Sequence, residues 1–263
     1  MTREFWQEIV NNKYQISSDP NALLSELLEM LASPDSELRD GFAYPILATW
    51  VQRDAFSKED LRSILGILEQ RLQVGLGEIG TDTVFARSFA ILMLAVLVNN
   101  KTLSLENTEI HNLLEVVLQY LEQEQDLRGF VQLQGWAHAV AHTADLLDEM
   151  AINEYCQTPE LERILNAITS KVAAKSVWLF DEEDRLSYAA ARVLERGLLE
   201  PDFVSGCFDG LAVRVSQADE LKSNAIPRHN AKVFLRSLYF LVLKLEPSSS
   251  HLELILTALE KLN

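Results

Sequence analysis

A basic residue opens an apolar run at five places along the chain, and these places are almost evenly spaced. The opening residues are Arg39, Arg87, His138, Arg185 and Arg236. Their numbers differ by 48, 51, 47 and 51. A helix pair that recurs at about 40 to 50 residues is typical of HEAT-like repeats, whose units stack side by side. The spacing therefore predicts an all-α, HEAT-like α-solenoid of about five helix pairs, with capping helices at both ends.

Leucine spacing supports the helical prediction. The first clear example is the group Leu23, Leu24, Leu27, Leu28 and Leu31, in which apolar residues return every three or four positions. No stretch alternates apolar and polar residues with β-branched enrichment, so we expect no strands. Sequence signals for helix starts occur at Ser57 and at Thr158-Pro159-Glu160. No linker is visible, so residues 1–263 are expected to form a single domain.

Composition and charge limit the classes of function. The net charge is −16, which at long range repels nucleic acid and anionic membranes, so neither is an expected partner. The longest apolar run, Phe89 to Val98, is shorter than the roughly 18 to 20 residues of a membrane span. The first ten residues are charged and amphipathic, and Cys156 and Cys207 form no metal-binding CxxC pair. These features favour a cytoplasmic location.

Three polar side chains interrupt the apolar segment from Gly135 to Met150. His138, His142 and Asp145 are spaced at i, i+4 and i+7, which on a helix stacks them on one face. Two histidines and a carboxylate at this spacing can bind a divalent metal. A histidine–aspartate pair can also perform acid–base catalysis. In the third interpretation, the polar groups satisfy one another inside a packed repeat.

Arginines suggest a second kind of site. If the five opening residues line successive inner helices, they form a ladder suited to carboxylate or phosphate groups. The alternative is that each arginine pairs with a neighbouring acid, such as Asp40 beside Arg39. Arg128 lies just before the histidine segment, and Trp136 either walls a pocket or fills the core. The predicted ligand-binding residues are Arg39, Asp40, Arg87, Arg128, Trp136, His138, His142, Asp145, Arg185, Arg192 and Arg236.

No catalytic or cofactor motif is complete. Gly75 to Gly80 reads GLGEIG and matches GxGxxG literally, but a helix is predicted before it where a dinucleotide site needs a strand. We interpret this segment as an interhelical connection. No motif requires a cofactor, so any cofactor is unknown from the sequence.

Three segments together resemble a known family. They are ARSF at Ala86 to Phe89, DLRGF at Asp126 to Phe130, and GWAHAVAHTADLL at Gly135 to Leu147. They are similar to an uncharacterised bacterial family, catalogued as the domain of unknown function numbered 2785, over about Leu38 to Leu241. The resemblance implies a bacterial, soluble, helical protein and supplies no activity.

Two functions are consistent with these patterns. The favoured one is a binding or scaffold module that holds an unidentified anionic small molecule or acidic protein segment in a concave groove lined by arginine and histidine. The alternative is a small-molecule enzyme, possibly metal-assisted, centred on His138, His142 and Asp145.

Overall fold

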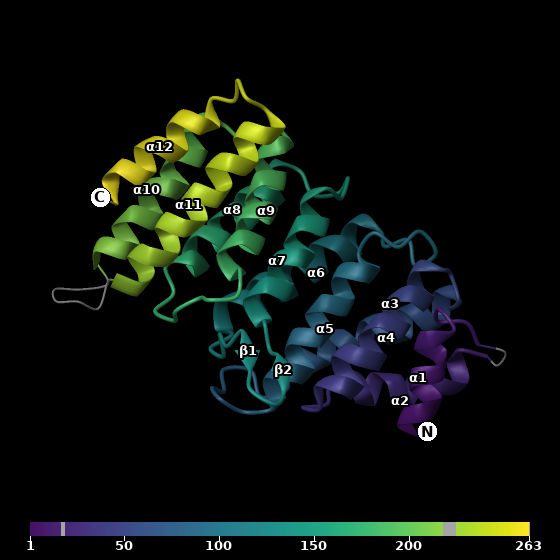
Figure 1. Cartoon of the computed structure of the whole chain (residues 1–263). Helices are drawn as coiled ribbons and strands as arrows, with labels where there is room; N and C mark the ends of the chain where they lie inside the picture. The colour runs from purple at the N-terminus through teal and green to yellow at the C-terminus, as the bar shows by residue number, and fades with distance from the viewer. Residues whose placement is uncertain (17–18, 218–224, 263) are drawn as a thin grey trace. The chain divides into compact units, whose positions relative to one another are not determined.

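The computed structural model describes residues 1–16, 19–217 and 225–262. Helices take up 69% of it, which confirms the all-α prediction. The elements are α1 (Arg3–Asn11), α2 (Asn21–Leu31), the π-helix η1 (Glu37–Ala43), α3 (Tyr44–Gln52), α4 (Lys58–Arg71), α5 (Thr83–Leu97), α6 (Asn107–Gln123), β1 (Phe130–Val131), β2 (Gly135–Trp136), α7 (Ala139–Ala151), α8 (Thr158–Val172), α9 (Glu182–Glu195), α10 (Pro201–Gln217), α11 (Ala225–Leu245) and α12 (His251–Lys261) (Figure 1).

The expectation of no strands is wrong at one place. β1 and β2 form a short antiparallel hairpin in which Phe130 pairs with Trp136 and Val131 pairs with Gly135. Each strand has only two residues, so the period-2 alternation that marks a strand has no room to appear in the sequence.

Local sequence signals explain several helix starts. The Ser57 hydroxyl accepts a hydrogen bond from the Asp60 N–H, and the Asp60 carboxylate accepts one from the Ser57 N–H. This reciprocal capping box satisfies two of the N–H groups that a helix start leaves without partners. α8 has the same arrangement between Gln157 and Glu160, with Pro159 in its first turn. The helix starts expected at Ser57 and Thr158 are therefore confirmed.

A wide turn precedes α3. η1 runs from Glu37 to Ala43, and the Tyr44 N–H donates to the carbonyl of Arg39, five residues back. Pro45 follows at once in α3 and has no N–H to donate. π-Helical turns are rare and occur mostly as short bulges, frequently at functional sites. Here the wide turn carries Arg39, whose side chain is buried.

The chain divides into two compact units. Unit 1 comprises residues 1–109 and 123–146, and unit 2 comprises residues 110–122 and 147–263. The largest buried side chains of unit 1 include Trp6, Phe85 and Phe89, and those of unit 2 include Phe208 and Phe234. The expectation of a single domain stays a prediction.

Helices that are nearly one repeat apart in sequence contact each other within each unit. The side-chain bonds that join them separate residues by 39 to 48 positions. These pairs are Asn21–Asp60 and Leu28–Arg71 between α2 and α4, Glu115–Arg163 between α6 and α8, and Asn166–Cys207 and Thr169–Arg214 between α8 and α10. Two of these pairs join α2 to α4, and two join α8 to α10. In both cases the residue numbers increase together on the two helices. α2 and α4 therefore run in the same direction, as do α8 and α10.

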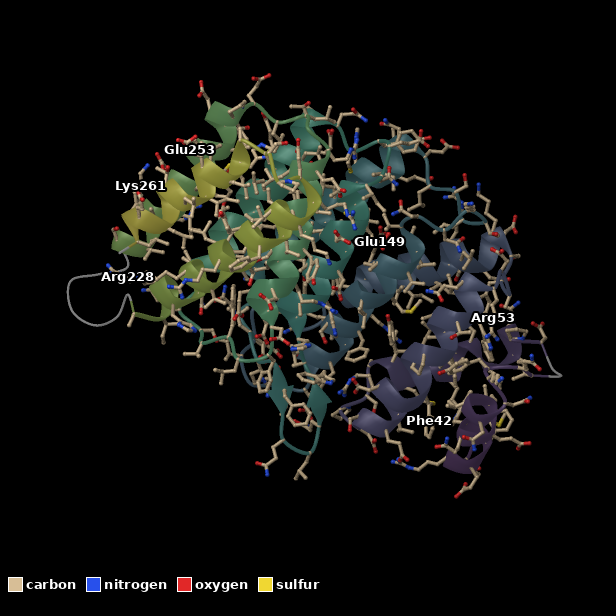
Figure 2. All side chains as sticks on the ribbon, turned by 45° about the horizontal axis from the view of Figure 1, so that its top comes forward. Phe42, Arg53, Glu149, Arg228, Glu253 and Lys261 are labelled. Carbon is tan, nitrogen blue, oxygen red and sulfur yellow. The ribbon has the colours of Figure 1, made fainter. Side chains whose placement is uncertain are left out.

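The outermost helix of unit 2, α12, packs against α10 and α11. Its Lys261 forms an ion pair with Asp209 of α10 at 2.5 Å. Glu253 and Lys261 lie on the exposed side of α12 (Figure 2). Within the described residues, no helix combines the length and apolar character needed to cross a membrane.

Candidate functional site

The hairpin and the start of α7 form the centre of the predicted site in unit 1. The Ala137 N–H donates to the Gly129 carbonyl at 2.8 Å, which closes the base of the hairpin. Ala137 and Ala139 then pack on Val84 and Phe85 of α5. Small side chains at these two positions let the hairpin backbone lie close to α5. The hairpin is therefore fixed to α5 at its base.

Arg39 holds the hairpin from the other side. Its Nη2 donates to the carbonyl oxygens of Gln134 at 2.6 Å and Trp136 at 3.3 Å, 95 and 97 residues away. Nη1 donates to the Ser33 carbonyl at 2.6 Å, and Nη2 also bonds the Asp40 carboxylate at 2.7 Å. The expected Arg39–Asp40 pair is thus confirmed.

The buried Arg39 guanidinium also lies against two aromatic rings and against Gly135. The Arg39 guanidinium lies 4.2 Å from the ring centre of Phe85 and 4.8 Å from that of Phe89. Gly135 has φ +80°, and a Cβ there would lie 2.6 Å from Ser36 Cβ and 3.1 Å from Arg39 Nη2. Only glycine fits this approach between the hairpin and η1.

Asp40 lies where the hairpin approaches η1, and its Oδ2 would be 3.3 Å from a Cβ at position 135. Burial raises its pKa, while the Arg39 guanidinium and His138 act in the opposite direction. Its carboxylate is 28% exposed and accepts the bond from Arg39. Asp40 therefore neutralises a buried cation at the foot of the hairpin.

Arg87 forms a second buried anchor. Its Nε and Nη2 donate to the two carboxylate oxygens of Glu124 at 2.6 and 3.0 Å, and both side chains are almost fully buried. Nη1 donates to the carbonyls of Val74 and Gly75 and to the Thr83 hydroxyl. The GLGEIG segment is therefore fastened at its first glycine by a charged side chain, and a helix, α4, precedes it as expected.

The Arg128 side chain pairs with Asp126, and the Arg128 backbone carbonyl accepts a hydrogen bond from the His138 N–H at 3.0 Å. Its Nε and Nη2 donate to the Asp126 carboxylate at 2.8 and 2.6 Å, and Nη2 also reaches the Thr81 carbonyl. The buried Asp126 carboxylate accepts the Gly80 N–H as well. This pair joins the residues before the hairpin to the GLGEIG segment.

The histidines do not share a helical stripe as predicted. α7 begins at Ala139, and His138 precedes it with φ +48°. The His138 carbonyl accepts the His142 N–H, which places His138 at the helix cap. His142 is buried, with Nδ1 3.0 Å from the Ser88 carbonyl, so Nδ1 carries the proton and donates. The two rings lie edge to face with centres 5.7 Å apart.

A three-ligand metal site is not formed by these side chains. Among the described residues, no group of three or more His, Cys, Asp or Glu side chains is placed to hold a metal ion. The reason at this site is that His142 turns Nδ1 to a backbone carbonyl, while His138 lies outside the helix that was expected to align it with Asp145. Metal binding by this group stays a prediction that the arrangement does not support.

The remaining arginines of the predicted ladder lie in unit 2 and have a different environment. Arg185 and Arg236 are exposed, whereas Arg39 and Arg87 are fully buried. Arg192 pairs with Asp148 at 3.2 Å and Glu195 at 2.8 Å on a half-exposed surface. The opening residues therefore differ in burial, and the ladder along one groove stays a prediction.

Three apolar side chains extend outward from the hairpin, and we call them the apolar tip. They are Phe130, Leu133 and Trp136, exposed at 48%, 92% and 37%. The Phe130 and Trp136 rings lie edge to face at 5.0 Å, and Trp136 stacks on His138 at 4.3 Å. Trp136 thus does not fill the core. The apolar tip also lies in a 16-residue stretch, 129–144, without Asp, Glu, Lys or Arg. That charge-free stretch is the sequence signal that could have identified it.

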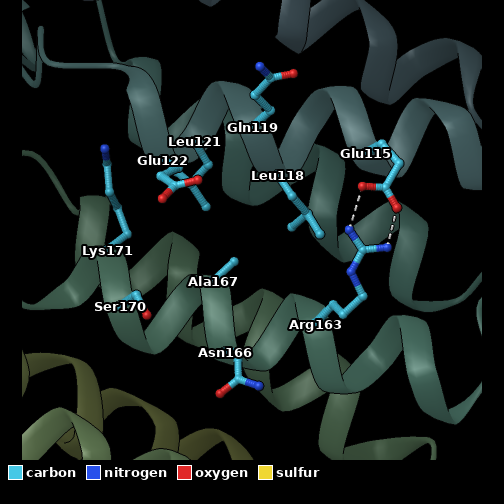
Figure 3. A pocket seen from close by; sticks show the side chains of 10 residues that line it. All are labelled: Glu115, Leu118, Gln119, Leu121, Glu122, Arg163, Asn166, Ala167, Ser170 and Lys171. Carbon is cyan, nitrogen blue, oxygen red and sulfur yellow. Dashed lines mark hydrogen bonds and ion pairs between the residues drawn. The ribbon is translucent and has the colours of Figure 1, made fainter.

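Unit 2 contains a groove that the sequence analysis missed. It lies between α6 and α8 and has a volume of about 570 Å³ (Figure 3). Leu118 of α6 and Ala167 of α8 contribute to its apolar lining. At one end Arg163 of α8 holds Glu115 of α6 through two bonds of 2.5 and 2.7 Å, and Glu122 and Lys171 line the other end. We call this feature the α6/α8 groove.

A family model described as a protein of unknown function, DUF2785, matches residues 72–240. The match covers well over half of the chain. The chain belongs to this family. No curated protein and no solved structure gives a significant match to it.

The extent of the DUF2785 match bears on the site. It includes Arg87, Arg128, the hairpin, α7 and the α6/α8 groove. It begins at residue 72, so the expected resemblance from about Leu38 is not matched at its N-terminal end, and Arg39 lies outside it. The family adds no activity to the residues described above.

Proposed function

We propose that this DUF2785 protein is a non-catalytic binding module that presents the apolar tip to a protein partner. One observation carries the proposal. The buried side chains of Arg39, Arg87 and His142 bond to groups inside unit 1, while the hairpin tip is apolar and exposed. Arg39, Arg87 and His142 act as supports for the hairpin rather than as ligand-binding groups.

The composition of the tip fits a binding surface. Protein interfaces are depleted in charged residues at their centre and enriched in aromatic side chains, and tryptophan is common among the residues that contribute most to affinity. The anchors at both sides of the hairpin hold the tip in one geometry before binding. Less conformational freedom is then lost on association, which favours affinity.

The HEAT-like arrangement is part of the same proposal. Contacts between helices 39 to 48 residues apart, with neighbouring helices running in the same direction, are what stacked helix pairs produce. In such a stack a loop or hairpin between helices is the place where a binding element is added without disturbing the packing.

Other ligands have less support. An anionic ligand or acidic peptide needs arginines with donors directed outward, but Arg39, Arg87 and Arg128 donate to carbonyls and carboxylates of unit 1. A small-molecule enzyme centred on His138, His142 and Asp145 needs a titratable group facing a substrate. His142 is buried against Ser88 and Phe89 and offers no such group to solvent.

Site-specific cross-linking tests the proposal. A benzophenone side chain is placed at Leu133, and at Ile79 as a matched control, because Ile79 is a 71% exposed apolar residue in another loop of unit 1. The partner captured from cells is identified, purified and titrated against the parent protein, Leu133→Ser and Ile79→Ser. We expect Leu133→Ser to weaken binding at least about tenfold, or about 1.4 kcal/mol, and Ile79→Ser to leave it unchanged. Capture of the same proteins at both positions, or equal affinities of all three proteins, would refute the proposal.

A further inference from the structure

We infer that the α6/α8 groove binds a small zwitterion, a molecule that carries an ammonium and a carboxylate close together and an apolar group beside them. Free apolar α-amino acids are the simplest members of this class. The inference goes beyond the proposed function, which concerns the hairpin of unit 1. The residues that line the groove all belong to unit 2, so the site is complete within one compact unit.

Two charged pairs set the register between α6 and α8. His111 Nε2 lies 3.6 Å from the carboxylate of Glu160, and Glu115 accepts two bonds from Arg163. The partners of these pairs are 49 and 48 positions apart, and their numbers increase together on the two helices. Residues about 49 positions apart on α6 and α8 therefore face each other.

The groove opens where this register brings a small side chain to one wall. One helical turn beyond the Arg163 bridge, Ala167 of α8 lies opposite Leu118 of α6, again 49 positions away. Alanine ends at Cβ and leaves the space between the helices unfilled. The resulting volume of about 570 Å³ lies within the range of about 300 to 1,000 Å³ that is typical of small-molecule clefts.

Opposite charges face each other one turn further along. Glu122 of α6 and Lys171 of α8 are also 49 positions apart, and Figure 3 shows them at the same end of the groove. Gln119 and Ser170 line the groove beside them. A carboxylate accepts from an ammonium, and the lysine ammonium donates to a carboxylate. A ligand that carries both groups on one carbon can therefore pair with both walls at once.

A ligand with a single charge fits this end less well. An anion beside Lys171 would lie near Glu122, and a cation beside Glu122 would lie near Lys171, so each would meet a like charge. A zwitterion pairs with both side chains and leaves no charge unpaired as water is displaced. Its apolar group would then lie on Leu118 and Ala167, between the charged end and the Arg163 bridge.

Titration calorimetry of the full chain with three matched probes tests the inference. L-Phenylalanine carries both charges, 2-phenylethylamine lacks the carboxylate, and 3-phenylpropionate lacks the ammonium. Each analogue leaves one wall of the groove without its charged partner. We therefore expect L-phenylalanine to bind at least about tenfold more tightly than either analogue.

Single variants assign each charge to its wall. Lys171→Gln should lower the affinity for L-phenylalanine to that for 2-phenylethylamine, and Glu122→Gln should lower it to that for 3-phenylpropionate. Ala167→Leu fills the groove and should abolish binding of all three probes. Glu253→Gln is the control, because it removes an exposed carboxylate elsewhere in unit 2 and should leave every affinity unchanged. Circular dichroism confirms that each variant is folded.

Three results would overturn the inference. They are a dissociation constant for L-phenylalanine above about 10 mM, equal affinities for the three probes, and unchanged binding by folded Ala167→Leu. The last result would mean that L-phenylalanine binds outside the groove. Each leaves the proposed function standing, because capture at Leu133 is measured separately.

Discussion

The buried pair of Arg87 and Glu124 gives a direct test of how the hairpin region is held together. We consider Arg87→Met, which keeps an unbranched apolar side chain of similar length and removes the charge and all the donors. Glu124 would then keep a carboxylate that is 2% exposed and has lost both bonds from Arg87. The carbonyls of Val74 and Gly75 would lose a donor as well.

The expected cost follows from this geometry. Removing one partner of a buried ion pair usually destabilises a protein by about 3 to 5 kcal/mol, because an uncompensated charge stays buried. The double variant Arg87→Met/Glu124→Met removes that charge too. It should cost at least about 1 kcal/mol less than the sum of the two single variants, since directly contacting residues are not additive. The exposed pair of Arg163 and Glu115 is the matched control, and Arg163→Met should cost about 0 to 1 kcal/mol.

Urea unfolding followed by tryptophan fluorescence measures these free energies. Three of the four tryptophans belong to unit 1, so fluorescence reports chiefly on the unit that contains Arg87. We expect the urea midpoint of Arg87→Met to fall by more than about 1 M at unchanged slope. If Arg87→Met costs less than about 1 kcal/mol, or if the double variant equals the sum of the singles, the buried pair does not stabilise the hairpin region.

Three further predictions concern single positions. Gly135→Ala should cost about 2 kcal/mol or more in thermal melts, because its Cβ would meet Ser36, whereas Gly197→Ala, with φ +63° but open space, should cost only about 1 kcal/mol. Burial and neighbouring acids raise the pKa of Glu183 above 4.5, so its ionisation opposes folding, and stability should fall as pH rises through the raised value. Glu183→Gln should remove that slope and stabilise the protein at pH 7; an unchanged slope in melts from pH 4 to 8 would contradict this. His142→Ala should lower stability by about 1 to 3 kcal/mol and leave the metal content measured by elemental analysis unchanged, and a loss of bound metal would restore the metal hypothesis.

The sequence predicted what local patterns determine. Leucine spacing identified helices, and capping residues located the starts of α4 and α8. The neighbouring acid of Arg39 was also foreseen, because Asp40 is adjacent in the chain. These features depend on residues within a few positions of one another, and such short-range interactions can be predicted from the sequence.

The site was less predictable because its contacts span the chain. Nothing near Arg39 indicates that its guanidinium will bond carbonyls 95 and 97 residues away. A buried arginine and an exposed one look the same in sequence, which is why Arg87 and Arg236 were expected to be equivalent. The histidine spacing suggested one stripe, but His138 adopts a positive φ at the helix cap, and a single residue outside the helix breaks the stripe.

The wide turn η1 makes the hairpin sensitive to chain length as well as to side chains. Arg39 reaches the hairpin from a turn that closes over five residues instead of four. Loss of one residue between Glu37 and Ala43 would allow an ordinary α-helical turn, and each residue of such a helix corresponds to about 100° of rotation. The guanidinium would then point away from Gln134 although every side chain of the hairpin was intact. Single-residue insertions and deletions in this turn, more than substitutions, are the changes through which a related chain would lose or acquire the anchored hairpin.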